Sequence, residues 1–337
     1  MSGKRWAALA IAAVLFVGSV VINFLSTFAF KGIETDINEF MNPSDKPYTE
    51  EVVQKGSELK KIVILNVDGV IQDTGDSAAS LLQNVSYNHQ EFMKKLNYIK
   101  KDDTVKGIII KVNSPGGGVV ESAEIHDRLK EIQKDTKKPV YISMGSMAAS
   151  GGYYISTAAK KIYASPETLT GSLGVIMEGI NYEGLADKYG VDFVTIKSGK
   201  YKDIMSPTRK MTEEERQILQ RMIDNSYEGF VKVISEGRQM TVDQVKKIAD
   251  GRIYDGRQAK DLHLIDGFGY LDDVISEMKK NEKLKGVKVV RYTDDLGLGS
   301  IFSLKAKKWM SDNSEMGGLM KIISRPNSPR IMYLYAR

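Results

Sequence analysis

Short apolar runs alternate with amphipathic stretches through most of this chain, and this alternation constrains its fold more than any other feature. The runs Lys61–Gly69 and Lys106–Gly118 have the composition of buried strands, and the second ends in three glycines. The stretch that follows places Ile125, Leu129 and Ile132 on one stripe of a helix. Strand–helix alternation of this kind predicts an α/β domain with a mostly parallel sheet.

The pattern continues toward the C-terminus. Further strands are expected at 138–144, 161–165, 174–177 and 191–199, with a helix over 148–161 between the first two. Two longer helices should begin at capping boxes, in which a threonine is followed three residues later by Glu or Gln. These pairs are Thr212 with Glu215 and Thr241 with Gln244.

An uncharged run from Trp6 to Phe30 precedes this domain. It is longer than the roughly 7–15 apolar residues of a cleaved signal peptide, and a helix of that length spans the ~30 Å hydrocarbon core. Basic residues before the run favour a cytoplasmic N-terminus and an extracytoplasmic domain. We therefore expect a single-pass protein of the cell membrane, with a tail at 1–5, an anchor at 6–30, a polar linker at 31–58, a catalytic domain at 59–293 and a C-terminal extension at 294–337.

Composition removes several classes of function. The 337 residues include no cysteine, which excludes disulfides, thiol catalysis and cysteine metal sites. The net charge of +5 comes from scattered basic residues, so no nucleic-acid partner is expected. No HExxH motif or carboxylate–histidine cluster indicates a metal site, and no phosphate-binding loop indicates a nucleotide. We expect neither metal nor cofactor.

The stretch Ser143–Ser156, SMGSMAASGGYYIS, carries no charge in a chain of which 27% is charged. It follows one predicted strand, and the glycines Gly116–Gly118 follow the preceding one. Loops at the carboxyl ends of neighbouring parallel strands face each other and commonly host a site. Small residues here fit tight helix packing, and they also fit a serine nucleophile whose oxyanion needs accessible N–H donors.

The general base is harder to assign from residue types. His89, His126 and His263 lie in no recognisable motif, and His126 is expected on a helix surface. The segment 196–207 holds three lysines, Lys197, Lys200 and Lys202. A lysine becomes a competent base when desolvation lowers its pKa to about 7–8. Spacing does not distinguish among the three.

Four motifs in this order closely resemble the signal peptide peptidase A family, in its short form from Gram-positive bacteria. They are NSPGGGVVESAEI, GSMAASGGYYIS, TLTGSLGVI and IKSGKYKDIMSP. The resemblance covers most of the chain and implies a fold of repeated ββα units, like that of the Clp protease proteolytic subunit and the crotonases. It also implies a homo-oligomeric ring in which the catalytic dyad is shared between protomers.

The same resemblance assigns roles to individual residues. Ser150 matches the family's nucleophile and Lys202 its base. Ser172 matches the hydroxyl that holds the lysine amine. The oxyanion donors would be the N–H groups of Gly117 and Gly151.

The expected function is a membrane-anchored serine endopeptidase that degrades remnant signal peptides and other unfolded peptides. Two alternatives belong to other classes. A crotonase-like acyl-CoA enzyme needs neither the anchor nor a serine in this position. A non-catalytic scaffold at the membrane would not require the motifs to be intact.

Overall fold

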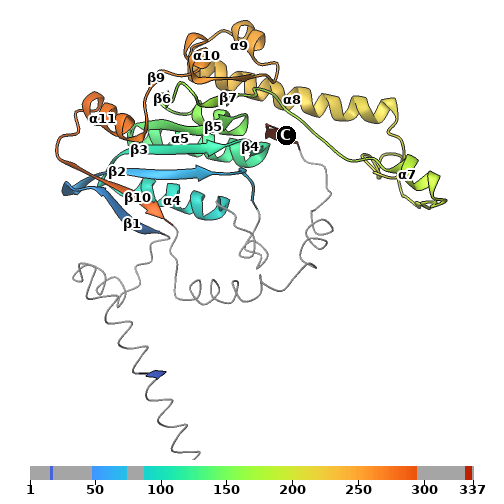
Figure 1. Cartoon of the computed structure of the whole chain (residues 1–337), viewed down its shortest axis with the longest axis horizontal. Helices are drawn as coiled ribbons and strands as arrows, with labels where there is room; N and C mark the ends of the chain where they lie inside the picture. Colours follow the sequence, from blue (N-terminus) through green and yellow to red (C-terminus); the bar gives the residue numbers. More distant parts are fainter. Residues whose placement is uncertain (1–15, 18–47, 74–86, 294–330, 336–337) are drawn as a thin grey trace, which may run out of the picture. The chain divides into compact units, whose positions relative to one another are not determined.

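The computed structural model describes residues 16–17, 48–73, 87–293 and 331–335. Figure 1 shows a central sheet with helices packed around it. The first half contains β1 (Thr49–Gln54), β2 (Ser57–Asp68), α4 (His89–Lys101), β3 (Val105–Ser114), β4 (Gly116–Gly118), α5 (Val119–Thr136), β5 (Val140–Ala149), α6 (Gly151–Ser156), β6 (Lys161–Ala164) and β7 (Leu169–Gly171). The second half contains α7 (Glu183–Lys188), α8 (Glu213–Arg238), α9 (Val242–Ile248), β8 (Ile253–Tyr254), α10 (Gly256–Asp261), β9 (Gly267–Phe268), α11 (Leu271–Asn281), β10 (Val287–Thr293) and β11 (Met332–Leu334).

The main sheet is mostly parallel, as the alternation predicts. Among the described residues it has nine strands in the order β1-β10-β2-β3-β5-β6-β9, and β7 and β8 branch from β5. Only the β1–β10 and β7–β8 pairings are antiparallel. The parallel central strands β2, β3 and β5 all end at the same edge of the sheet, which is where β4 and α6 begin.

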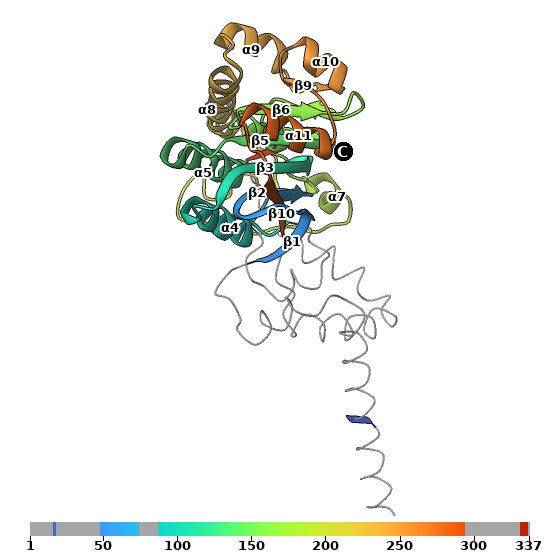
Figure 2. The same cartoon turned by 90° about the vertical axis from the view of Figure 1, so that its left-hand side faces the viewer.

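Alternate residues of the central strands enter two separate cores. Val63 and Ile110 face the core that is closed by α4, α5 and α6. Ile64 and Ile109 face the opposite core, which α11 closes with Val274, Ile275 and Met278. Figure 2 shows α4 and α5 on one side of the sheet and α11 on the other. Burial on both faces explains why these strands read as continuous apolar runs.

Most of the predicted elements are confirmed, and three differ. The helix expected over 148–161 is only α6, because β5 continues to Ala149. The expected strands at 174–177 and 191–199 do not form, apart from one bridge at Ile176. Apolar composition predicted strands there, but in the described structure 191–199 has no partner strand and 174–177 pairs with β11 only at Ile176. The sheet also includes β1, whose residues the sequence placed in the polar linker.

The predicted membrane anchor lies outside the described residues, apart from Phe16 and Val17. In the part of the chain that the structure describes, no helix is both long enough and apolar enough to cross a bilayer.

Candidate active site

Ser150 lies at the turn between β5 and α6, in a backbone conformation that few serines adopt. Its φ is 53° and its ψ is −115°. The turn is held by the Ser150 N–H, which donates to Gly171 O over 2.8 Å, and by the Tyr154 N–H, which donates to Ser150 O over 2.8 Å. The side chain is fully buried, and its Oγ has no hydrogen-bond partner among the described residues. Strain and an unpaired buried hydroxyl both cost stability, and features of this kind concentrate at functional sites.

The glycine strand β4 lies directly beside this turn. A Cβ placed on Gly116 would lie 2.6 Å from Gly151 N and 3.1 Å from Ser150 Cβ, and a Cβ on Gly151 would lie 3.1 Å from Gly117 N. Glycine is needed here because the backbones approach so closely. The sequence expectation that the two glycine-containing loops meet is therefore correct.

The orientation of the Gly117 N–H follows from its neighbours. Gly118 N–H donates to Ile71 O, and Ile71 N–H donates to Gly116 O, each over 2.8 Å. Backbone groups alternate in direction along a strand, so the Gly117 N–H points away from Ile71. It therefore faces the side on which an extended segment can pair.

A segment of the chain already occupies that side. The strand β11 pairs antiparallel with β4, with Tyr333 opposite Gly117. Its other edge pairs with Ile176, through Met332 N–H to Ile176 O at 2.9 Å and Ile176 N–H to Met332 O at 3.0 Å. A Cβ placed on Gly116 would lie only 2.1 Å from Tyr333 O. A peptide carbonyl thus lies beside both of the expected oxyanion donors.

The Tyr333 side chain fills an aromatic pocket. It is 2% exposed and packs on Tyr154 and Phe230 at ring-centroid distances of 4.9 and 4.6 Å. Its hydroxyl donates to Ser226 O over 2.9 Å. The site can therefore hold an extended backbone together with a large aromatic side chain.

Ser172 is brought next to Ser150 by strand register. β5 and β7 are parallel neighbours with Ala149 opposite Gly171, so each serine directly follows one member of this pair. Ser172 also has a positive φ, of 50°, and its N–H donates to Arg252 O over 2.7 Å.

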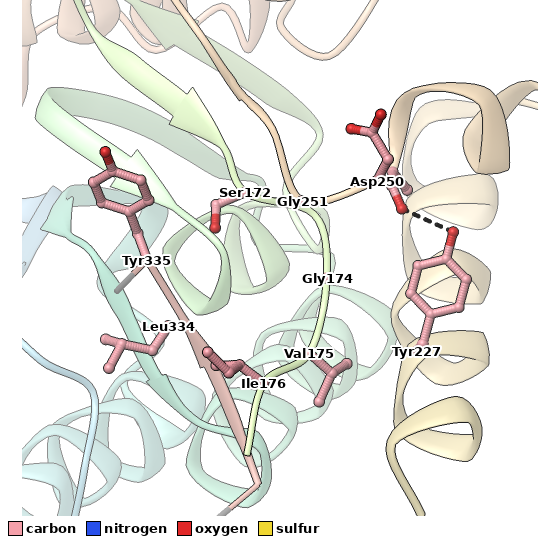
Figure 3. A pocket seen from close by; sticks show the side chains of 10 residues that line it. Ser172, Gly174, Val175, Ile176, Tyr227, Asp250, Gly251, Leu334 and Tyr335 are labelled. Carbon is pink, nitrogen blue, oxygen red and sulfur yellow. Dashed lines mark hydrogen bonds between the residues drawn. The ribbon is translucent and has the colours of Figure 1, made fainter. Parts of the chain in front are cut away.

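Ser172 lines a cavity of about 480 Å³. Figure 3 shows Ser172, Leu334 and Tyr335 on one side of this cavity in that view, with Tyr227 and Asp250 on the other. Val175 and Ile176 form part of its wall. Space for a further side chain is thus available beside Ser172.

Lys202 lies in the turns between α7 and α8, and its side chain is exposed. Figure 1 shows the segment between these helices projecting away from the sheet. No hydrogen bond within the described ranges joins Lys202 to Ser150. One chain therefore brings together Ser150, Ser172 and the glycines, but it does not bring Lys202 to them.

The structure separates the three lysines that spacing left equivalent. Lys197 Nζ is paired with Asp203 Oδ1 at 2.6 Å, and Lys200 Nζ is paired with Glu214. The bond to Glu214 raises the pKa of Lys200. Lys202 has no ion pair in the described part of the chain. A carboxylate partner holds an amine in its charged form, so the ion pairs of Lys197 and Lys200 set these two lysines apart from Lys202.

Two of the three histidines, His89 and His126, are buried. His126 is 6% exposed, so its expected position on a helix surface is wrong. It packs edge-on against Tyr154 behind the aromatic pocket, and burial lowers its pKa. His89 is buried between Tyr87 and Glu124, with ring nitrogens 2.8 and 2.9 Å from their oxygens. In the described ranges, no group of three or more His, Asp or Glu residues is arranged to hold a metal.

The sequence left the apolar C-terminal tail open to two interpretations, packing between protomers or lying in a substrate groove, and the structure pairs it with β4. The segment Ile331–Tyr335 is apolar but too short to show a period, so its pairing with β4 could not be predicted. Its only signal was an apolar, aromatic composition. Arg209, which organises the Lys202 segment, likewise had no signal beyond its charge.

Comparison with known proteins places this geometry in a family. The model of "Peptidase family S49" matches residues 132–285, and the Clp protease model matches residues 77–170. A protein of Enterococcus faecium whose assigned name is signal peptide peptidase SppA is 40% identical over 345 residues, covering 99% of both chains.

More distant relatives share parts of the chain. Protease 4 of Salmonella typhi is 38% identical over 58% of this chain and 31% of its own length. The chloroplastic serine protease SPPA of Arabidopsis thaliana is 31% identical over 63% of this chain and 33% of its own length. The near-complete match to the Enterococcus protein, together with the family model and the protease relatives, shows that the chain belongs to peptidase family S49 and is a serine peptidase.

Proposed function

We propose that the protein is a membrane-anchored endopeptidase that cleaves remnant signal peptides and other unfolded peptides with a Ser150–Lys202 dyad. Ser150 Oγ attacks the scissile carbonyl carbon and transfers its proton to the neutral Lys202 amine. The N–H groups of Gly117 and Gly151 stabilise the oxyanion. Cleavage of the C–N bond returns the proton to the leaving amine, and water then hydrolyses the acyl-serine with the Lys202 amine again accepting a proton.

The observation that carries this proposal is the peptide strand beside Ser150. β11 pairs with the glycine strand on one edge and with Ile176 on the other, and the Tyr333 carbonyl lies next to Gly116 and Gly151. An unfolded peptide that adds a strand in the same way would present its carbonyl to Ser150. The aromatic pocket supports substrates with large apolar side chains, which remnant signal peptides contain.

The dyad is completed between two copies of the chain. Lys202 belongs to a segment whose apolar side chains are exposed: Val194 is 89% exposed and Ile196 is 96% exposed. The same segment exposes Ile180, Leu185, Tyr189 and Phe193. Single chains rarely leave such a surface uncovered, which supports assembly through this segment. The cavity beside Ser172 offers a place for the Lys202 side chain of a neighbouring copy, and repetition of this contact would close a homo-oligomeric ring.

Burial at that contact would also make Lys202 a base. An exposed lysine is protonated at neutral pH, and desolvation disfavours its ammonium form. The Ser172 hydroxyl can then position the amine without adding a negative charge. Assembly and activity should therefore depend on each other.

Mixing two inactive variants tests the shared dyad. Ser150→Ala and Lys202→Ala chains should each fail to hydrolyse a peptide, because each lacks one reacting group. Rings assembled from both should recover part of the activity, since some interfaces pair an intact serine with an intact lysine. Verified mixed rings without activity, or a fully active monomer, would contradict the shared site.

Fluorophosphonate labelling tests the nucleophile separately. The reagent should label the wild-type chain at Ser150 and leave Ser150→Ala unlabelled, with Ser146→Ala as a matched control that keeps labelling. A wild-type chain that stays unlabelled while a peptide is being cleaved would refute the serine mechanism.

Protease added to intact protoplasts tests the topology. A domain outside the membrane should be digested after Phe30 without lysis. Protection of the domain until lysis would place it in the cytoplasm and remove signal peptides released outside from its substrates.

A further inference from the structure

A cluster of charged residues surrounds the turn that carries Lys202, and nothing in the catalytic scheme above uses it. Asp203, the residue after Lys202, accepts two hydrogen bonds of 2.8 Å from Arg209, through Nε to Oδ2 and Nη2 to Oδ1. Arg209 also donates to both carboxylate oxygens of Glu215, at 2.9 and 2.5 Å. Further bonds run to Asp203 O and Lys210 O, each 3.0 Å long. One guanidinium thus joins the Lys202 turn to the first turn of α8.

The cluster is compact although most of its surroundings are exposed. The Asp203 side chain is 15% exposed and the Glu215 side chain 3%, whereas Arg209 is 29% exposed. Glu215 is also fixed by the capping box with Thr212. Bidentate bonds between arginine and carboxylate are among the stronger and more directional ion pairs. Arg209 therefore holds its partners in one geometry rather than forming a loose surface contact.

The cluster is also balanced in charge. Lys197 Nζ is the second cation on Asp203, at 2.6 Å from Oδ1. The two positive charges of Arg209 and Lys197 balance the two negative charges of Asp203 and Glu215. These bonds lower the pKa of Asp203, chiefly through Arg209, and lower the pKa of Glu215 to about 2. Both carboxylates are charged at neutral pH, and both are engaged by cations other than Lys202.

A free carboxylate at position 203 would oppose catalysis by Lys202. An opposite charge within about 4–6 Å favours the charged form of a group by roughly 1–3 pKa units. An ammonium stabilised in this way loses its proton only at higher pH, and only the neutral amine can accept a proton from serine. The residue that follows a catalytic lysine is therefore a poor place for an unpaired aspartate.

We infer that Arg209 is a positioning residue of the peptidase, which holds the Asp203 carboxylate away from the Lys202 amine and so keeps that amine available as a base. This inference rests on the proposed role of Lys202. Lys200 and Tyr201 also bond to Glu214, and these bonds join the same turn to the first turn of α8.

The test is the pH dependence of kcat/KM for the full chain in detergent, with a fluorogenic peptide. Wild-type activity should rise with pH as Lys202 loses its proton. Arg209→Gln leaves the cluster with one surplus negative charge. The acid limb of this variant, the part of the profile where kcat/KM rises with pH, should therefore move to higher pH by about one unit. At a fixed pH on the limb, this shift is roughly a tenfold loss of kcat/KM. At still higher pH its activity should approach that of the wild type.

Three variants distinguish the effect of the Arg209 charge from the structural effect of losing its side chain. Asp203→Asn with Arg209→Gln restores the balance, and its limb should return toward the wild-type position. Asp203→Asn alone leaves a surplus positive charge and should move the limb to lower pH, which keeps the inference testable if Arg209→Gln does not assemble. Arg216→Gln, on the exposed first turns of α8, is the matched control and should not move the limb.

Two results would overturn the inference. One is a pH profile of kcat/KM for Arg209→Gln whose acid limb lies at the same pH as that of the wild type but whose plateau is lower. This result would indicate a purely structural role for Arg209. The other is a double variant whose limb stays with that of Arg209→Gln. Lys202→Ala tests the proposed base separately. If Lys202 is not the base, this variant should keep its activity. If Lys202 is the base and only the role of Arg209 is wrong, Lys202→Ala should be inactive at every pH.

Discussion

Replacing Gly117 by alanine tests the geometry of the oxyanion donors most directly. A Cβ at this position would lie 1.8 Å from Ile71 O and 2.6 Å from the Ile71 carbonyl carbon. These are backbone atoms, so no side-chain rotation relieves the overlap. To reach the ~3.3 Å of a close C···O contact, β4 and the Ile71 segment would have to separate by roughly 1–2 Å.

That displacement predicts a defect in kcat. The Gly117 N–H would move by a similar distance from the carbonyl it is proposed to bind. Loss of one oxyanion donor costs about 10²–10³ in kcat, and a 1 Å misplacement alone costs on the order of 10². We expect kcat to fall by about 10²-fold while KM changes less. Overpacking should also lower the free energy of unfolding by about 1–3 kcal/mol.

The assay compares steady-state kinetics and denaturant unfolding of Gly117→Ala with those of Gly229→Ala. Gly229 is exposed on α8, and a Cβ there would meet nothing within 4 Å, so this control should keep its rate and lose no stability. Gly117→Ala with a wild-type kcat would refute the role assigned to this N–H. A folded, assembled variant with a raised KM alone would show that Gly117 only aligns the substrate strand.

Four further results follow from the same structure. Lys197→Ala and Lys200→Ala should each keep most of their activity above the acid limb, and loss of all activity in either would reassign the base. Ser172→Ala should lower kcat through lost orientation, whereas Ser172→Asp should move the acid limb of kcat/KM to higher pH; an unmoved limb would place Ser172 away from the base. The pKa of His126 is lowered in the folded chain, so below about pH 6.5 the unfolded chain binds the proton more readily and the free energy of unfolding falls. His126→Gln should weaken this acid sensitivity in urea titrations. An equal slope of the free energy of unfolding against pH in the variant and the wild type would contradict this. Deletion of residues 331–337 frees both edges that bind β11, so it should lower KM for a peptide, and an unchanged KM would show that the tail does not compete.

Local sequence patterns determined most of the fold and the meeting of the two glycine-containing loops. Continuous apolar runs arise where a parallel strand is buried on both faces, so β2, β3 and β5 could be recognised without a structure. The capping box of Thr212 could be recognised because it is satisfied within one helical turn. Ser150 and the glycines stood out because close backbone approach demands small residues, whatever the distant parts of the chain do.

Tertiary structure decided what depends on contacts between distant segments. The pairing of Tyr333 with Gly117 joins residues far apart in sequence, and no local period records it. Lys197 and Lys200 each meet a carboxylate, and only the placement of Asp203 and Glu214 in the folded chain shows this. The segment 191–199 has strand-like composition but no partner strand in the described structure, because backbone pairing needs a neighbour as well as a propensity.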